Sequence, residues 1–315
     1  MKNNKYIQEI ETKGIKWINV SKQSEPELNY LQKQFDLDEL DIKESLPPFQ
    51  RAKIAKRPDY YFMVLHFPIF DRVSRRLLFT EVDFFLSHNY LITVHDGKLI
   101  ALEQFFNQCK KYPQMSNEYF TGSAVHILFE LLNRMLEAIF PILLHVNDDI
   151  TLVDKKLFTH ISGQEMAEEV LRLKTNVVTF RRTMQGHRTV MERLILYSGM
   201  FNDKNLDLQA QQHYINSLRE FTSEIWHMLE NQRESINALH ETNESIISLR
   251  TNQVMKILTI ISVITFPLSL LAAIFAIDAP GRPFVDWPYG FWIICGLMVL
   301  GATFMISLFK KKKWL

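Results

Sequence analysis

The sequence predicts an α+β cytoplasmic domain with a mostly antiparallel sheet, followed by a long helical stalk and two C-terminal transmembrane helices. Three observations lead to this fold class. Strand and helix signals alternate over residues 1–100, the 67 residues from Met200 to Phe266 contain neither glycine nor proline, and two uncharged apolar segments follow residue 256. The 315 residues carry 36 Lys and Arg against 35 Asp and Glu, so bulk charge gives no reason to expect a nucleic-acid partner.

Residues 1–98 are predicted to form a cytoplasmic α/β domain. Its β-type runs are rich in aromatic and β-branched residues, and the tight connection Ser87–Asn89 favours antiparallel pairing of the last two runs. Histidines occur beside these runs, but single histidines on strands are more often packed or solvated than bound to a metal. The runs are residues 6–10, 15–20, 60–67, 77–86 and 90–94, and the histidines are His66, His88 and His95.

Residues 99–199 are predicted to be helical, because apolar positions recur at helical spacing over 122–158 and 162–196. Pro141 is expected to kink the first of these helices or to divide it in two. His145 and Asp149 stand four residues apart, a spacing that suits zinc, but the remaining ligands are missing and a solvated helix face is favoured.

Residues 200–256 are predicted to form a stalk helix. A helix without glycine or proline over this length would extend on the order of 100 Å. Apolar residues such as Leu218, Ile225 and Leu239 follow a seven-residue spacing and would form a seam along one side of the helix. The polar residue Gln232 interrupts this seam. This pattern predicts packing on neighbouring helices or on other copies of the chain.

Two segments are predicted to cross a membrane. Residues 257–277 are 21 residues without a charge, which as a helix span about 31 Å and match a hydrocarbon core of about 30 Å. Residues 290–309 form the second uncharged run, and the extracytoplasmic loop 278–289 contains three prolines that turn the chain back. Cations flank both spans on one side and include four lysines in the tail 310–315, so both termini are expected in the cytoplasm.

One face of the stalk end and first span mixes apolar and polar side chains at steps of three and four. If several copies placed this face around an axis, its apolar members would form constrictions that gate by dewetting, and its polar members would form polar rings. Two spans cannot enclose a pore, so conduction would require an oligomer. The alternative is a packing face whose serines bond to their own helix carbonyls. The candidate pore-lining and gate residues are Asn252, Met255, Leu258, Ser262, Phe266 and Ser269.

Several segments closely resemble the CorA family of magnesium and other divalent metal ion transporters, the two-span Gly-x-Asn superfamily. They are the run TNQVMKILTII at 251–261 with FPLS at 266–269, the terminal FKKKKWL, and the strand-pair phrase at 82–95. The resemblance implies a funnel-shaped homopentamer in the plasma membrane, or in the inner membrane of a Gram-negative cell. Each first span would line an axial pore for Mg2+, with Co2+, Ni2+ or Zn2+ carried by related members.

At the expected outer mouth of the pore, this chain departs from the family motif. Where the family has Gly-Met-Asn, this chain has Ala276, Ile277 and Asp278. A ring of Asp278 carboxylates would attract cations as a metal-binding selectivity mouth, or Asp278 would simply end the helix outside the bilayer. The resemblance also implies acidic residues that sense cytoplasmic Mg2+, and Asp71 is the nearest candidate by position.

The sequence contains no phosphate-binding glycine loop, no Ser-His-Asp arrangement and no His-Glu-x-x-His motif. We therefore expect neither an enzyme nor an organic cofactor, and passive flux of ions. The expected partners are other copies of the chain, the lipid bilayer and divalent cations. The alternative function is a membrane-anchored oligomeric scaffold or metal sensor that has lost conduction together with Gly-Met-Asn.

Overall fold

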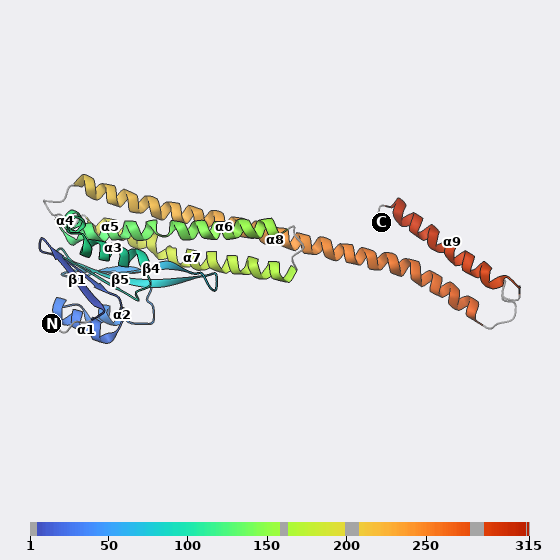
Figure 1. The fold of residues 1–315 in the computed structure, drawn as a ribbon, viewed down its shortest axis with the longest axis horizontal. Coiled ribbons are helices and arrows are strands. Elements are labelled where there is room, and N and C mark those ends of the chain that lie inside the picture. The colour runs from blue at the N-terminus through green and yellow to red at the C-terminus, as the bar shows by residue number, and fades with distance from the viewer. Residues whose placement is uncertain (1–4, 158–162, 199–207, 278–286, 313, 315) are drawn as a thin grey trace. The chain divides into compact units, whose positions relative to one another are not determined.

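The computed structural model describes residues 5–157, 163–198, 208–277, 287–312 and 314. It divides into two compact units, Met1–His240 and Glu241–Leu315 (Figure 1). The strands are β1 (Ile7–Thr12), β2 (Ile15–Val20), β3 (Lys53–Lys56), β4 (Tyr61–Asp71), β5 (Arg76–Leu86) and β6 (Tyr90–His95). The helices are α1 (Glu25–Phe35), α2 (Glu39–Glu44), α3 (Ile100–Lys111), α4 (Pro113–Tyr119), α5 (Ala124–Glu137), α6 (Phe140–Lys156), α7 (Gly163–Ser198), α8 (Leu208–Ala276) and α9 (Gly290–Lys311).

The six strands form one mixed sheet in the order β1-β2-β6-β5-β4-β3. Only the β2–β6 pair is parallel among the described strands, and every other neighbouring pair is antiparallel. The longest pairing joins β4 to β5 from Tyr61↔Leu86 to Asp71↔Arg76. The predicted α+β class with a mostly antiparallel sheet is therefore confirmed.

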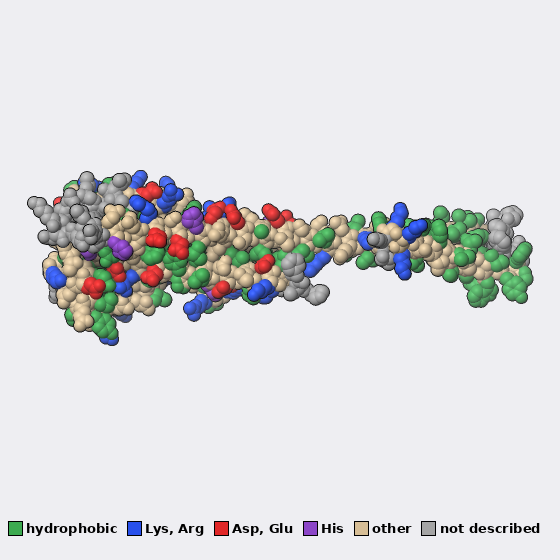
Figure 2. Space-filling model, turned by 90° about the horizontal axis from the view of Figure 1, so that it is seen from above, with side chains coloured by type: hydrophobic (Ala, Val, Ile, Leu, Met, Phe, Trp, Pro, Cys, Tyr) green, Lys and Arg blue, Asp and Glu red, His purple; other side chains and the backbone are tan. Residues whose placement is uncertain are grey.

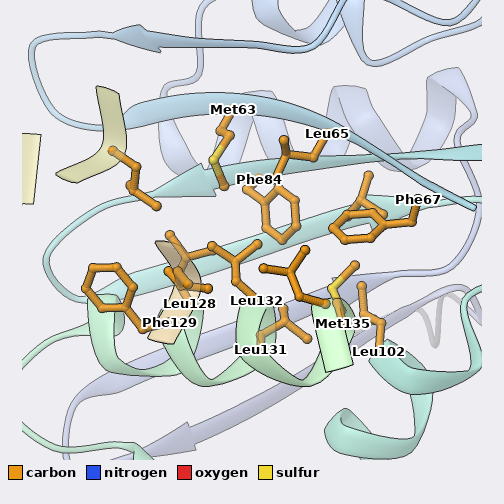
Figure 3. Packing of buried hydrophobic residues seen from close by; sticks show 14 of the residues in the cluster. Met63, Leu65, Phe67, Phe84, Leu102, Leu128, Phe129, Leu131, Leu132 and Met135 are labelled. Carbon is orange, nitrogen blue, oxygen red and sulfur yellow. The ribbon is translucent and has the colours of Figure 1, made fainter. Parts of the chain in front are cut away.

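Both faces of the sheet are buried because side chains alternate along each strand. In β5, Phe84 packs into the larger apolar cluster, whereas its neighbour Phe85 packs into a smaller cluster on the other face. Figure 3 shows the larger cluster, in which Met63 and Phe84 from the sheet meet Leu128 and Leu132 from α5. Helices α1 and α2 cover the smaller cluster (Figure 1).

In the first unit, α8 packs through the seam that its seven-residue spacing predicts. Leu218 and Ile225 are each 1% exposed, and Leu239 is 6% exposed. The polar interruption Gln232 is also buried and donates its Nε2–H to the carbonyl of Leu143, at 2.8 Å. Gln232 thus stabilises the contact between α8 and α6. The predicted division at Pro141 is also present, because α5 ends at Glu137 and α6 begins at Phe140.

A partly buried cluster of charges holds the β4–β5 turn to α6 and α7. The two carboxylate oxygens of Asp149 accept hydrogen bonds from Arg75 and from Arg172, each at 3.0 Å. Glu169 pairs with both guanidinium groups, and Asn176 donates to the carbonyl of Arg75 at 2.9 Å. Asp149 is therefore engaged by arginines, and no group of three or more potential ligands around a metal occurs in the described residues.

Helix α7 approaches the sheet very closely at one glycine. A Cβ atom built on Gly186 would lie 2.3 Å from the Cβ of Ala52, the residue before β3. This separation is far shorter than a van der Waals contact, so no larger residue fits without movement of α7 or of the strand. The next residue in α7, His187, is fully buried and its Nε2 lies 2.5 Å from the carbonyl oxygen of His66.

We expect His187 to make folding stability depend on pH between about 6.5 and 4. Burial is the main cause that lowers the pKa of His187 from 6.5 to about 4. The unfolded chain therefore takes up a proton at a higher pH than the folded chain, so stability is complete above pH 6.5 and is lost as pH falls toward 4. The loss should be on the order of 3 kcal/mol at the acid end.

The measurement is the denaturation midpoint of the full chain at a series of pH values, compared with His187→Gln. The glutamine amide also donates a hydrogen bond but does not titrate. The difference between the two proteins should grow in favour of the wild type as pH rises from 4 to 6.5. A difference that stays constant with pH would show that folding does not lower the pKa of His187.

Candidate functional site

The second unit contains the end of α8 and α9, two helices long and apolar enough to cross a membrane. The most apolar windows of these helices have mean hydropathy 2.4 and 2.2, and only 6% and 0% of those windows are buried. A buried core helix of a soluble protein would have most of such a window covered. Hydrophobic side chains dominate the visible surface of this unit (Figure 2).

Five apolar residues of α8 that are covered in this unit form one stripe along the helix. Ile260 is 9% exposed, and four further residues of the stripe are partly buried. At Leu268 the stripe meets α9, because a Cβ built on Gly301 would lie 3.6 Å from Leu268 Cδ2, an ordinary contact distance. The stripe is therefore the side of α8 that packs on α9. The four further residues are Ile264, Leu268, Leu271 and Phe275.

The predicted pore-lining residues lie on the opposite side of α8. At 100° per residue, Met255, Ser262 and Phe266 fall within about 20° of the direction opposite to Ile264. Met255 is 58% exposed, Leu258 53% and Phe266 72%, and Asn252 and Ser269 are also exposed. Ser262, the remaining candidate, is partly buried. The structure thus brings the candidates together on one face, and every candidate except Ser262 is exposed in a single chain.

The two serines of this face do not bond to their own helix. The threonine hydroxyl of Thr259 donates to the carbonyl of Met255 at 2.8 Å, and Thr251 does the same to Ile247 at 2.9 Å. Ser262 and Ser269 make no such bond with any group in the described part of the chain. Their hydroxyls are therefore available to water or to another chain.

Pro267 lies inside α8, which continues through it to Ala276. Proline has no backbone N–H, so the carbonyl of Val263 one turn earlier lacks its helical donor. In a bilayer such a carbonyl needs a donor from a neighbouring helix or from water in a cavity. Pro267 follows Phe266 directly but lies 100° further around the helix, nearer to the stripe that packs on α9 than to the candidate face.

At the predicted mouth, the structure places two of the three candidate residues. Ala276 is exposed and is the last residue of α8, and Ile277 follows with 58% exposure. Asp278 lies outside the described residues.

Asp71, the regulatory candidate, lies at the β4–β5 turn in the first unit. Its carboxylate accepts hydrogen bonds from the Ser74 hydroxyl at 2.6 Å and from the Val73 N–H at 3.0 Å. These bonds lower the pKa of Asp71 below its ordinary value, with the Ser74 bond as the largest cause. The structure therefore gives Asp71 a local role in stabilising the turn.

Comparison with known proteins decides the family. The model of the CorA-like Mg2+ transporter protein family matches residues 12–311. The chain belongs to this family. The match covers strands β2 to β6 of the first unit as well as α8 and α9, so the resemblance predicted from the sequence motifs is confirmed over nearly the whole CorA-like chain.

Individual CorA relatives agree in length and in fold. The cobalt/magnesium transport protein CorA of Thermotoga maritima is 24% identical over 283 residues, which are 89% of this chain and 78% of that protein. The cobalt/magnesium transport protein CorA of Methanocaldococcus jannaschii is 22% identical and covers 95% and 91% of the two chains. The solved structure of CorA magnesium transporter from the same organism has a TM-score of 0.80 at 20% identity, with coverage of 98% and 94%.

Proposed function

We propose that this protein is a CorA-like transporter or channel for divalent metal ions, with passive flux through an axial pore of a homopentamer. The observation that carries the proposal is the open face of α8 on the side opposite to α9. Such a face has a use when copies of the chain surround an axis and turn it inward. Mg2+ is the proposed cargo, with Co2+, Ni2+ and Zn2+ as further candidates, since the relatives are named for magnesium and cobalt transport.

The residues of this face suit a gated pathway for a hydrated cation. Met255, Leu258 and Phe266 would form apolar rings that exclude water when narrow, and Asn252, Ser262 and Ser269 would form polar rings between them. Mg2+ gives up its waters reluctantly, so neutral oxygen ligands that accept its hydration shell are suitable. A membrane potential that is negative inside contributes about 2.3 kcal/mol per charge per 100 mV, hence about twice that for a divalent ion.

The direct test combines assembly with flux. The full chain in detergent should be a pentamer by native mass spectrometry, and proteoliposomes with a negative interior should take up Mg2+ and Co2+ without an energy source. A stable monomer or dimer would eliminate the pore, because two spans per chain cannot enclose one. Empty liposomes give the background leak.

A second function is supported by the departure at the mouth of the pore. A chain that has lost Gly-Met-Asn would serve as a membrane-anchored oligomeric scaffold or metal sensor without conduction. This alternative predicts a pentamer that carries no ions, so flux separates the two functions whereas assembly does not. In either case we place the protein in the plasma membrane with both termini in the cytoplasm, and we retain Asp71 as a candidate regulatory ligand.

We expect Asp278→Asn to reduce the pH dependence of uptake and to lower cation affinity. A ring of carboxylates would bind divalent cations more tightly than amides and with less regard for ion size. Crowded carboxylates raise one another's pKa, so uptake should fall as external pH drops and the ring protonates. Uptake of Mg2+, Co2+ and Zn2+ by both proteins at two external pH values checks this. Identical profiles would mean that Asp278 only ends the helix.

A further inference from the structure

A cavity of about 760 Å3 opens in the first unit, where three parts of the chain meet. These parts are the end of β4 with its following turn, the loop between β6 and α3, and the junction of α5 with α6. Its walls are mostly apolar and include Phe70, Leu99 and Ile142, while Ile100 in its lining is 71% exposed. The volume lies within the range of roughly 300–1,000 Å3 that is typical of small-molecule sites.

The charged groups that line this cavity are mainly cationic. Arg72, Arg75 and Lys98 contribute three cations against the single acid Asp149. Both oxygens of Asp149 already accept hydrogen bonds from arginines, so this acid has little capacity left for a ligand cation. From outside the lining, Asp96 pairs with Lys98 and Glu169 pairs with Arg75. Arg72 is exposed and has no ion-pair partner among the described residues. The surplus charge at the cavity is therefore positive.

The backbone at the cavity adds to this preference. Leu99, the residue that caps the start of α3, lines the cavity together with the first two residues of the helix. Leucine has no side-chain acceptor, so no side-chain bond caps the N–H groups of the first turn. These N–H groups favour a negative charge in the same place as Arg72 and Lys98.

The aromatic part of the wall is held in place. The ring of Phe70 meets the ring of His145 from α6 edge-to-face, with centroids 4.6 Å apart. The Arg75–Asp149 bond beside it ties the β4–β5 turn to the same helix. A ligand would therefore find walls that are already formed, which reduces the entropy lost on binding.

We propose that this cavity binds a small organic anion with an apolar body, whose charged head lies at Arg72 and the start of α3 and whose body lies against Phe70 and Ile142. The head is a carboxylate or a chemically similar group, because a guanidinium donates to it in a bidentate geometry. The body is either an acyl chain or a fused ring, and both have the same contact chemistry. The site is separate from the α8 face and does not depend on ion transport.

Equilibrium dialysis of the full chain in lipid nanodiscs tests the proposal, with empty nanodiscs as the background. The probes are labelled octanoate and 2-naphthoate, and octanol and 2-naphthol are the neutral controls. We expect saturable binding of one anion per chain, and binding of the neutral analogue at least about tenfold weaker. Stronger binding of octanoate identifies an acyl ligand, and stronger binding of 2-naphthoate identifies a ring.

Two variants test separately how the charge of Arg72 and the open volume of the cavity contribute to anion binding. Arg72→Gln should weaken binding about tenfold or more, whereas Lys174→Gln, which removes an exposed cation on α7, should leave binding unchanged. Ala138→Trp should abolish binding by filling the cavity from an exposed position in its lining. Absence of saturable binding by either anion, equal binding of the neutral analogues, or retained binding in Ala138→Trp would overturn the proposal. Arg72 has no partner in the described chain, so its variant reports on binding even if Ala138→Trp fails to fold.

Discussion

Met255→Ser and Phe266→Ser should each raise basal ion flux through the reconstituted protein by about tenfold or more. Each change replaces an apolar ring with a hydroxyl ring, which hydrates a constriction that otherwise excludes water. A barrier lowered by only about 1.4 kcal/mol already gives a tenfold rate. Stability should change little, because Met255 is 58% and Phe266 72% exposed within the chain. Flux of Mg2+ into proteoliposomes measures the effect.

Ile261→Ser is the matched control for these variants. Ile261 is 55% exposed in the same span, but it lies about 140° around the helix from Phe266. We expect its flux to equal that of the wild type. If all three serine variants raise flux equally, the effect comes from a loosened span and not from the proposed face. If none does, the apolar residues of this face do not form the barrier.

Gly186→Ala should destabilise the first unit by about 1–3 kcal/mol, the usual cost of an overpacked core. At an exposed position inside a helix, glycine to alanine stabilises by about 1 kcal/mol. A loss of stability here would therefore indicate the close contact between α7 and Ala52. The new methyl would lie 2.3 Å from the Cβ of Ala52, which forces α7 away from the sheet. Chemical denaturation of the full chain measures the loss.

Ala52→Gly in the Gly186→Ala background provides the control. This second change removes the atom that the new methyl meets, so we expect the double variant to recover most of the lost stability. The coupling between two neighbouring changes is read from the double-mutant cycle. Additive losses would show that α7 and the start of β3 are not in contact at this point.

The sequence predicted the secondary structure where local signals are strong. The division at Pro141, the seam through Leu218 and Ile225, and the two uncharged spans all follow from residue type and spacing. Strand order was less accessible, because the parallel pair of β2 with β6 joins residues more than 70 positions apart. The Asp149 cluster likewise unites a turn and two helices, and spacing within one helix gave only a weak zinc alternative.

The residues of the candidate face of α8 were predictable from the sequence, but the sequence did not show that this face points away from α9. The first span is apolar nearly all round, so steps of three and four also fit the stripe of Ile260, Ile264 and Leu268. Periodicity alone does not distinguish a face that packs on α9 from one that remains open. The approach of Leu268 to α9 beside Gly301 makes the distinction.

Pro267 gives the first span a mechanical property. A helix that lacks one hydrogen bond bends more easily there than elsewhere, and proline is the usual position of a kink. Residues from Asn252 to Ser262 lie on one side of this soft point, and Ser269 with Ala276 lies on the other. Tilting of the long α8 helix is therefore absorbed at Pro267 before it reaches the outer end of the span. In the proposed pore, the inner constrictions and the outer mouth would then be able to open at different times, as two gates in series.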